Sequence, residues 1–73
     1  MTDRRQLPRR TNGSAIASAR ISRGMTQAQL GAAIGTSGSQ VANWETGFRR
    51  PKLDALLRIA DALNVPLDDL INK

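Results

Sequence analysis

The 73-residue sequence contains no cysteine, no histidine and no tyrosine. Without cysteine and histidine, the chain can build neither a disulfide framework nor a zinc ribbon, and it lacks the groups of a thiol nucleophile or a Ser-His-Asp triad. Asp3 and Glu45 are the only carboxylates before residue 53. We therefore expect a protein that is not an enzyme and that holds no metal and no other cofactor.

Long apolar runs are also missing. No segment approaches the ~18 apolar residues that span a bilayer, and the N-terminus has no apolar stretch of the signal-peptide type. We expect a cytoplasmic protein with no membrane partner. A chain of this length is one small domain, and without disulfides it must be stabilised by packing between helices.

Acidic residues are few and are concentrated near the C-terminus. Eleven Lys and Arg face six Asp and Glu, which gives a formal net charge of +5. Residues 1–52 hold nine of the basic residues but two of the acidic ones, and the other four acidic residues lie in 53–73. This asymmetry suits a polyanion approached from one side, such as a nucleic acid, although a solvated surface has the same composition.

The first twelve residues differ in composition from the rest of the chain. Four of them are arginine, and there is too little apolar surface to contribute to a core. We expect residues 1–12 to be a flexible basic arm and residues 13–73 to be the folded domain.

From residue 13 onward, apolar residues recur at helical spacing and predict an all-α fold of five short helices without a sheet. Thr26, with Gln29 three residues later, forms a capping box at the start of the second helix, and Ser37 starts the third. The expected helices include one that carries Ile16 and ends near Gly24, then 26–34, about 37–46 and 53–63, and a short one at 67–71 after Pro66. We expect one core made of Ile16, Leu30, Ile34, Val41, Trp44, Leu56, Ile59, Ala60, Leu63 and Leu70.

The two aromatic residues are expected in different places. Trp44 follows Val41 by three positions and therefore belongs to the packed face, although a tryptophan can also stack on a single-stranded base. Phe48 follows Gly47, and we expect it either to cover the edge of the core or to support the basic segment after it.

The second and third helices are separated by the short turn Gly35-Thr36-Ser37, which holds them at a large angle. Opposite the apolar face of the third helix lies a face of small, hydroxyl and amide residues, namely Ser37, Gly38, Ser39, Gln40 and Asn43. Such a face can enter a major groove and form hydrogen bonds with base edges, although a solvated helix can have the same composition.

Many residues of this part of the chain have the identities and spacing that characterise one known family of domains: Thr26-Gln27, Leu30, Gly35, Ser37, Val41, Trp44-Glu45, Gly47, Pro51, Leu56, Ile59-Ala60, Leu63, Val65 and Leu70. With these residues, 13–71 resembles the Cro/CI phage-repressor-like, or XRE, family of helix-turn-helix domains. The resemblance implies a lambda-repressor-like bundle of five helices, sequence-specific binding to double-stranded DNA and, commonly, repression of transcription.

The resemblance also assigns roles to individual positions. The start of the third helix becomes the base-reading site, with Ser37, Gly38, Ser39, Gln40 and Asn43. Many relatives carry a larger residue at the position of Gly38, which itself has no side chain to read a base, so Ser39 and Asn43 are the stronger candidates. Gln27 would contact the phosphate backbone, although it also suits a plain capping role beside Thr26. Several cationic residues are also expected along the DNA backbone. With Gln27 they make up the predicted phosphate-contacting set, which is Arg9, Arg10, Arg20, Gln27, Arg49, Arg50 and Lys52.

Glu45 is the only acidic residue in 14–52, the most basic part of the chain. An unpaired carboxylate there would oppose DNA binding. The resemblance implies an ion pair between Arg20 and Glu45 that fixes the orientation of the reading helix, and the alternative is that both side chains are solvated.

A single reading helix contacts too few base pairs to select one site in a genome, so we expect a homodimer on a palindromic operator. The candidate interface residues are Leu57, Leu67, Leu70 and Ile71, with the core competing for Leu70. The expected function is a DNA-binding transcription regulator, and a repressor in particular. The alternatives are an antitoxin with a toxin partner, a restriction–modification controller, or an adaptor that binds another protein.

Overall fold

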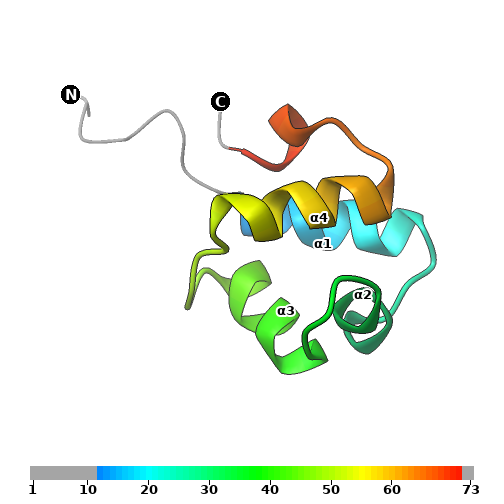
Figure 1. Ribbon diagram of the computed structural model, residues 1–73, viewed down its shortest axis with the longest axis vertical. Coiled ribbons are helices and arrows are strands. Elements are labelled where there is room, and N and C mark those ends of the chain that lie inside the picture. Colours follow the sequence, from blue (N-terminus) through cyan, green and yellow to red (C-terminus); the bar gives the residue numbers. More distant parts are fainter. Residues whose placement is uncertain (1–11, 72–73) are drawn as a thin grey trace.

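The computed structural model describes residues 12–71, and this part of the chain is helical with no strand. The predicted arm lies outside the described residues except for Asn12. In Figure 1, α4 lies in front of α1, α2 and α3 lie below them, and η1 lies above α4. The helices are α1 (Gly13–Ser22), α2 (Gln27–Ala33), α3 (Gly38–Thr46), α4 (Leu53–Leu63) and the 3-10 helix η1 (Leu67–Leu70).

The predicted all-α class is confirmed, with one difference in the last element. The expected fifth helix is a four-residue 3-10 turn rather than an α-helix. The N–H of Asp69 donates to Pro66 O at 3.0 Å and the N–H of Ile71 donates to Asp68 O at 3.3 Å, so the hydrogen bonds of this turn span three residues, as in a 3-10 helix. None of the helices within residues 12–71 is long and apolar enough to cross a membrane.

Side-chain caps begin the first three helices. The capping box of α2 is confirmed: Thr26 Oγ1 accepts the N–H of Gln29 at 3.0 Å, and the Thr26 N–H donates to Gln29 Oε1 at 2.8 Å. Ser37 Oγ accepts an N–H at the start of α3 at 3.1 Å. Asn12 Oδ1 accepts the N–H of Ala15 at 3.1 Å, so Asn12 is the N-cap of α1 and not part of the arm to which it was assigned.

The end of α4 is closed by its own cap and by the side chain of Arg23, the residue after α1. Asn64 adopts the left-handed conformation with φ of 57°, as expected for a helix terminator. Arg23 Nε donates to Leu63 O at 2.7 Å, and Arg23 Nη2 donates to Asn64 O at 3.3 Å. The guanidinium therefore satisfies carbonyl groups that a helix end leaves without partners, and its charge complements the helix dipole.

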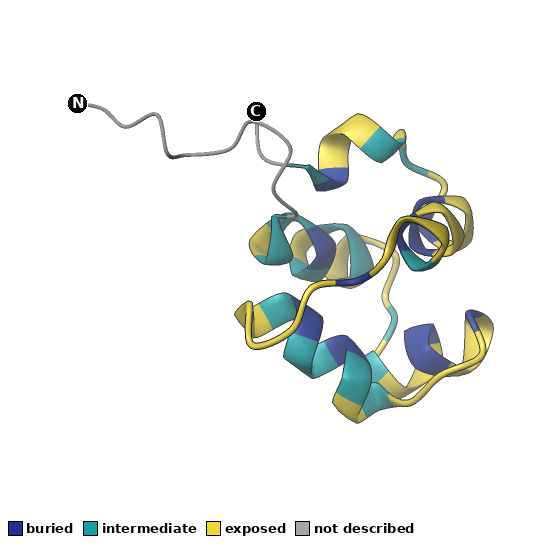
Figure 2. Cartoon of the chain, turned by 60° about the vertical axis from the view of Figure 1, so that its left-hand side comes forward, coloured by how far each residue is buried: buried dark blue, intermediate teal, exposed yellow. Residues whose placement is uncertain are grey.

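The core prediction is confirmed in full. The ten expected residues are the ten buried apolar residues of the described chain: Ile16, Leu30, Ile34, Val41, Trp44, Leu56, Ile59, Ala60, Leu63 and Leu70. Figure 2 shows the buried positions distributed over all five helical elements rather than within one pair. One core therefore fixes the position of α3 relative to the rest of the molecule.

Two glycines allow α2 and α3 to approach closely. A Cβ on Gly31 would lie 2.6 Å from the carbonyl carbon of Ser37 and 2.9 Å from the nitrogen of Gly38. A Cβ on Gly38 would lie 3.0 Å from Cα of Ala28. Because these neighbours are backbone atoms, a side chain at either position would push the two helices apart, most strongly at Gly31.

Candidate nucleic-acid interface

The turn between α2 and α3 is closed by a backbone hydrogen bond and contains a glycine with positive φ. The N–H of Thr36 donates to Gly31 O at 2.8 Å, and Gly35 takes a positive φ of 82° that a side chain would strain. Together with the close approach at Gly31, these features hold the start of α3 at a fixed position against α2. A surface presented by α3 is therefore organised before any ligand binds.

The helix α3 separates its buried and accessible residues as predicted. Val41 is fully buried and Trp44 is 7% exposed, so both belong to the core. The predicted reading residues all keep some accessibility: Ser37 and Ser39 are exposed, and Gly38, Gln40 and Asn43 are partly buried. The structure thus brings the five residues together between Ser37, the residue before α3, and Asn43, the sixth residue of the helix.

Gly38 has a packing role that its sequence position did not reveal. Its Cα faces the first turn of α2, where an added Cβ would meet Ala28 at 3.0 Å. A larger residue at this position would require α2 to move. Gly38 therefore offers backbone groups alone to a ligand, and Ser39 and Asn43 are accessible polar side chains on the same helix.

Gln40 is less well placed than Ser39. Its Oε1 atom is buried and has no hydrogen-bond partner among the described residues. A buried acceptor without a partner is costly, and it is not presented to a base in this conformation. Gln40 would need another rotamer to act in base reading.

Arg20, Gln27 and Glu45 form a network between α1, α2 and α3. Arg20 donates from Nε to Glu45 Oε2 at 2.6 Å and from Nη2 to Oε1 at 3.1 Å, while Nη1 donates to Met25 O at 2.8 Å. The side chains of Arg20 and Glu45 are 13% and 7% exposed. The predicted ion pair is therefore confirmed, and it is bidentate and largely shielded from solvent.

The sequence did not predict the third member of this network. Gln27 Nε2 donates to Glu45 Oε1 at 3.0 Å, so the carboxylate is held from two sides. Residues 27 and 45 lie far apart in the sequence, and no pattern in the sequence pairs them. A side-chain amide nitrogen carries two N–H groups, so Gln27 retains one donor for another acceptor.

The electrostatics of the network keep its charges in place at neutral pH. Burial raises the pKa of Glu45, but hydrogen bonds from Arg20 and Gln27 and the charge of Arg20 outweigh it, and the net pKa lies below its ordinary value. The hydrogen bond to Glu45 raises the pKa of Arg20 above its ordinary value, against the effect of burial. The paired charges cancel locally, so Glu45 adds no uncompensated negative charge beside α3.

The segment after α3 carries a group of exposed cations. Arg49, Arg50 and Lys52 are exposed, and the N–H of Arg49 donates to Asn43 O at 3.1 Å, which holds the segment against α3. Phe48 is 75% exposed, so the expectation that it covers the edge of the core is wrong. Its ring instead lies beneath the guanidinium of Arg49, whose Cζ is 5.7 Å from the ring centroid.

Of the predicted phosphate contacts, two lie outside the described residues and a third is engaged within the protein. Arg9 and Arg10 fall outside the described residues. Arg20 donates three of its five N–H groups inside the protein and is 13% exposed, so it is mainly a structural residue.

The predicted interface residues divide between core and surface. Leu70 is fully buried and cannot contact a second chain, which corrects its assignment, because η1 turns its side chain into the core. Leu67 and Ile71 are partly buried, and Leu57 is 50% exposed. Leu53, which the sequence did not single out, is 63% exposed.

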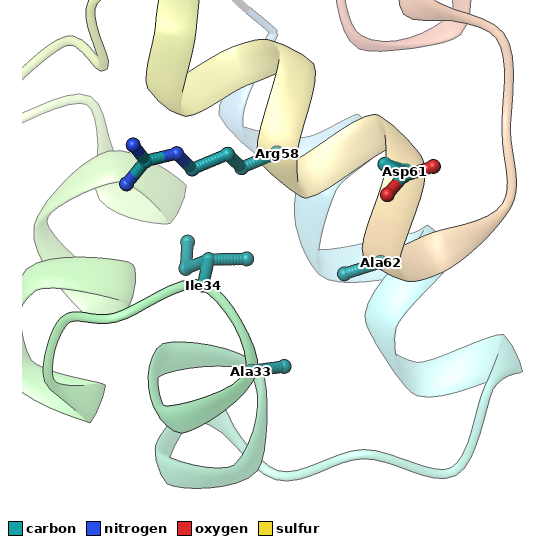
Figure 3. A pocket seen from close by; sticks show the side chains of 5 residues that line it. All are labelled: Ala33, Ile34, Arg58, Asp61 and Ala62. Carbon is teal, nitrogen blue, oxygen red and sulfur yellow. The ribbon is translucent and has the colours of Figure 1, made fainter.

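A groove of about 640 Å³ lies at the junction of α4 and η1 and includes Leu53, Leu67 and Ile71 in its lining, but not Leu57. Apolar side chains and three charged residues line it: Arg50, Pro51, Lys52, Leu53, Leu56, Leu67, Asp68 and Ile71. A second pocket of about 470 Å³ lies between α2 and α4. In Figure 3, Arg58 and Asp61 extend to opposite sides of that pocket, and the rest of its lining is Ala33, Ile34 and Ala62. Its charged groups do not converge on one point, so it offers no built binding site.

Comparison with known proteins agrees with this geometry. The model of a helix-turn-helix family matches residues 16–70. A comparison with curated protein sequences gives no significant match. Among solved structures, the P22 c2 repressor bound to a synthetic operator is 31% identical with a TM-score of 0.76, over 80% of this chain and 88% of the repressor chain.

Two further structures show how widely the domain is used. The restriction-modification controller C.AhdI from Aeromonas hydrophila is 29% identical with a TM-score of 0.75, over 80% of this chain and 88% of its own. PlcR from Bacillus thuringiensis, in complex with the peptide PapR7 and DNA, is 38% identical with a TM-score of 0.72, over 80% of this chain but 20% of PlcR. By its family match, its fold and its α2–α3 geometry, the chain belongs to the Cro/CI-type (XRE) helix-turn-helix family.

Proposed function

We propose that this protein is a sequence-specific, double-stranded DNA-binding transcription regulator that acts as a repressor by occupying its operator. The observation that carries the proposal is the closely packed α2–α3 unit, which presents hydroxyl and amide side chains beside an exposed basic segment. The P22 c2 repressor, which has this fold, was solved on an operator and supports the same use here. Binding alone performs this function, and no catalytic group is required.

The proposed contacts fall into two classes. Ser39 and Asn43 form hydrogen bonds with base edges in the major groove, because they are the accessible polar side chains of α3 with no competing role. Arg50 and Lys52 bind phosphates, and Gln27 adds its second amide N–H at the start of α2. Arg20 is left out of this set because its donors serve Glu45 and Met25.

Selection of bound duplexes from a random DNA pool tests the function. A consensus site recovered at physiological salt would support sequence-specific recognition. Recovery of unrelated sequences, with the same affinity for all of them, would remove the proposal. A palindromic consensus would further support binding by two copies.

Substitutions at Asn43 and Lys52 are expected to have different effects. Asn43→Ala removes a base contact worth about 1–3 kcal/mol and should relax sequence preference at one position of the site. Lys52→Ala removes a phosphate contact, so it should weaken binding to selected and scrambled duplexes alike and flatten the log–log salt dependence by about 0.9. Titrations of both duplexes across a salt series measure these effects. A uniform loss at Asn43, or a loss at Lys52 confined to the selected duplex, would reverse the assignments.

We further propose that the active species is a homodimer, formed by the groove between α4 and η1. The exposed Leu53 of each copy would enter the groove of the other, beside Leu57 and Ile71. The apolar part of the groove lining, Leu53, Leu67 and Ile71, would then be shared by two copies related by a two-fold axis. The apolar area is small, which implies a weak dimer that a palindromic site strengthens.

The dimer proposal predicts that Leu53→Ala lowers self-association without unfolding the domain, because Leu53 is 63% exposed and outside the core. Ile21→Ala is the matched control, since Ile21 is 64% exposed on α1. Sedimentation of both variants, free and with the selected duplex, gives the stoichiometry. One protein per duplex at saturation for the wild type, or equal dimerisation of the two variants, would exclude this interface.

A restriction–modification controller is the second candidate role, favoured by the similarity to C.AhdI over most of both chains. Both roles use the same DNA contacts. A restriction enzyme gene next to the gene for this protein, with the selected site upstream of it, would distinguish the controller from a general repressor.

A further inference from the structure

Phe48 is an exposed aromatic residue on a segment with defined structure. It is the only phenylalanine in the chain and is 75% exposed. Gly47 before it takes a positive φ of 85° as the cap of α3, and the N–H of Phe48 lies 3.4 Å from Thr46 Oγ1. The N–H of Arg49 donates to Asn43 O on α3. The ring is therefore held outward next to α3, although no core contact requires it there.

The surroundings of the ring are cationic. The guanidinium of Arg49 lies over it, and Arg50 and Lys52 follow within four residues, all of them exposed. A flat apolar group among cations matches a polymer in which apolar rings alternate with anions. The backbone of DNA has this chemistry, because deoxyribose rings alternate with phosphates.

We infer that Phe48 packs its ring against a deoxyribose at the edge of the groove that α3 enters, while Arg49, stacked on that ring, reaches the adjacent phosphate. This inference rests on the proposed function. The cation–π contact restricts the guanidinium to one side of the ring and leaves its N–H groups free to donate. Phe48 thereby positions the basic segment along the backbone and does not read sequence.

Fluorine NMR can test the contact directly, because 4-fluorophenylalanine would label this chain at Phe48 alone. Addition of the selected duplex is expected to shift the single resonance and to reduce its difference between H₂O and D₂O, as the ring loses solvent. A duplex that binds by gel mobility but leaves the resonance unchanged would overturn the inference and leave the proposed function intact. A shift with protein concentration in the absence of DNA would assign the ring to a protein contact and overturn the inference as well.

The variant Phe48→Ala tests the energetic role. Loss of a partly buried aromatic contact should weaken binding about tenfold on the selected and the random-sequence duplex alike, without changing the salt slope. Arg49→Ala should instead flatten that slope by about 0.9, because it removes a phosphate contact. Ile21→Ala, an equally exposed apolar change on α1, should bind as the wild type does.

Three outcomes would overturn the inference while DNA binding itself stands. One is wild-type affinity for Phe48→Ala. Another is a loss confined to the selected duplex, which would make Phe48 a base-reading residue that contacts a thymine methyl group. The third is equal weakening by Ile21→Ala. If the wild type bound no duplex at all, the proposed function would fail first.

Discussion

Trp44→Ala is expected to unfold much of this protein at 37 °C. Trp44 is 7% exposed and packs in the single core through which α3 is attached to the other helices. Truncation of a buried aromatic residue costs about 3–5 kcal/mol, and a domain of this size has on the order of 4–11 kcal/mol in total. The melting temperature should fall by about 12–40 °C, which circular dichroism at 222 nm would record.

Phe48→Ala is the control for this change, because it truncates the only other aromatic side chain of the sequence at a position that is 75% exposed. It should melt within a few degrees of the wild type. Equal melting temperatures for Trp44→Ala and the wild type would mean that the face of α3 assigned to the core is solvated. In that case the opposite face could not be the reading surface.

The core could be predicted from the sequence because it depends on local periodicity. Leu56, Ile59 and Leu63 recur along one side of a helix, and all three are buried. The capping box of Thr26 and Gln29 is equally local, since donor and acceptor lie three residues apart. Asn64 as a helix terminator follows from the tolerance of asparagine for positive φ.

Contacts between distant positions could not be derived in this way. Arg23 closes the end of α4, forty residues later in the chain, and Gln27 binds Glu45 across two helices. Long side chains reach such partners only after the helices are packed. Neither contact corresponds to a periodic pattern in the sequence. The pair of Arg20 and Glu45 was found because the family resemblance supplied it, not because spacing did.

Close approaches of backbone are hidden for a similar reason. Gly38 reads as a position without a recognition side chain, whereas the structure shows the first turn of α2 against it. Leu70 and Ile71 are adjacent and both apolar, and the turn geometry of η1 alone decides that Leu70 is buried. Helical periodicity tells buried from exposed positions along a long helix, but it cannot do so for adjacent apolar residues at the end of a four-residue turn.

Arg20→Ala is expected to destabilise the domain by about 1.5–3 kcal/mol at pH 7, because it leaves the largely shielded carboxylate of Glu45 without a counter-charge and with the hydrogen bond from Gln27. The joint substitution Arg20→Met with Glu45→Leu removes both charges and should recover most of that stability. If the ion pair orients α3, the joint variant should still bind the selected duplex more weakly than the wild type. Chemical denaturation and duplex titration of the two variants separate stability from orientation.

The sign of the pH dependence follows from the lowered pKa of Glu45. A carboxyl group with a lowered pKa in the folded state stabilises the protein fully above its ordinary value of 4.5, and this stabilisation is lost as the pH falls through the folded-state pKa. The cost of Arg20→Ala should therefore be large at pH 7 and shrink steadily below pH 4.5, where protonation removes the stranded charge. Glu45→Gln should flatten the acid side of the stability profile for the same reason. If the cost of Arg20→Ala stayed constant from pH 7 to pH 3, the ion pair with Glu45 would not be the source of the stabilisation. Arg20 would then stabilise the fold through its packing and its hydrogen bond to Met25.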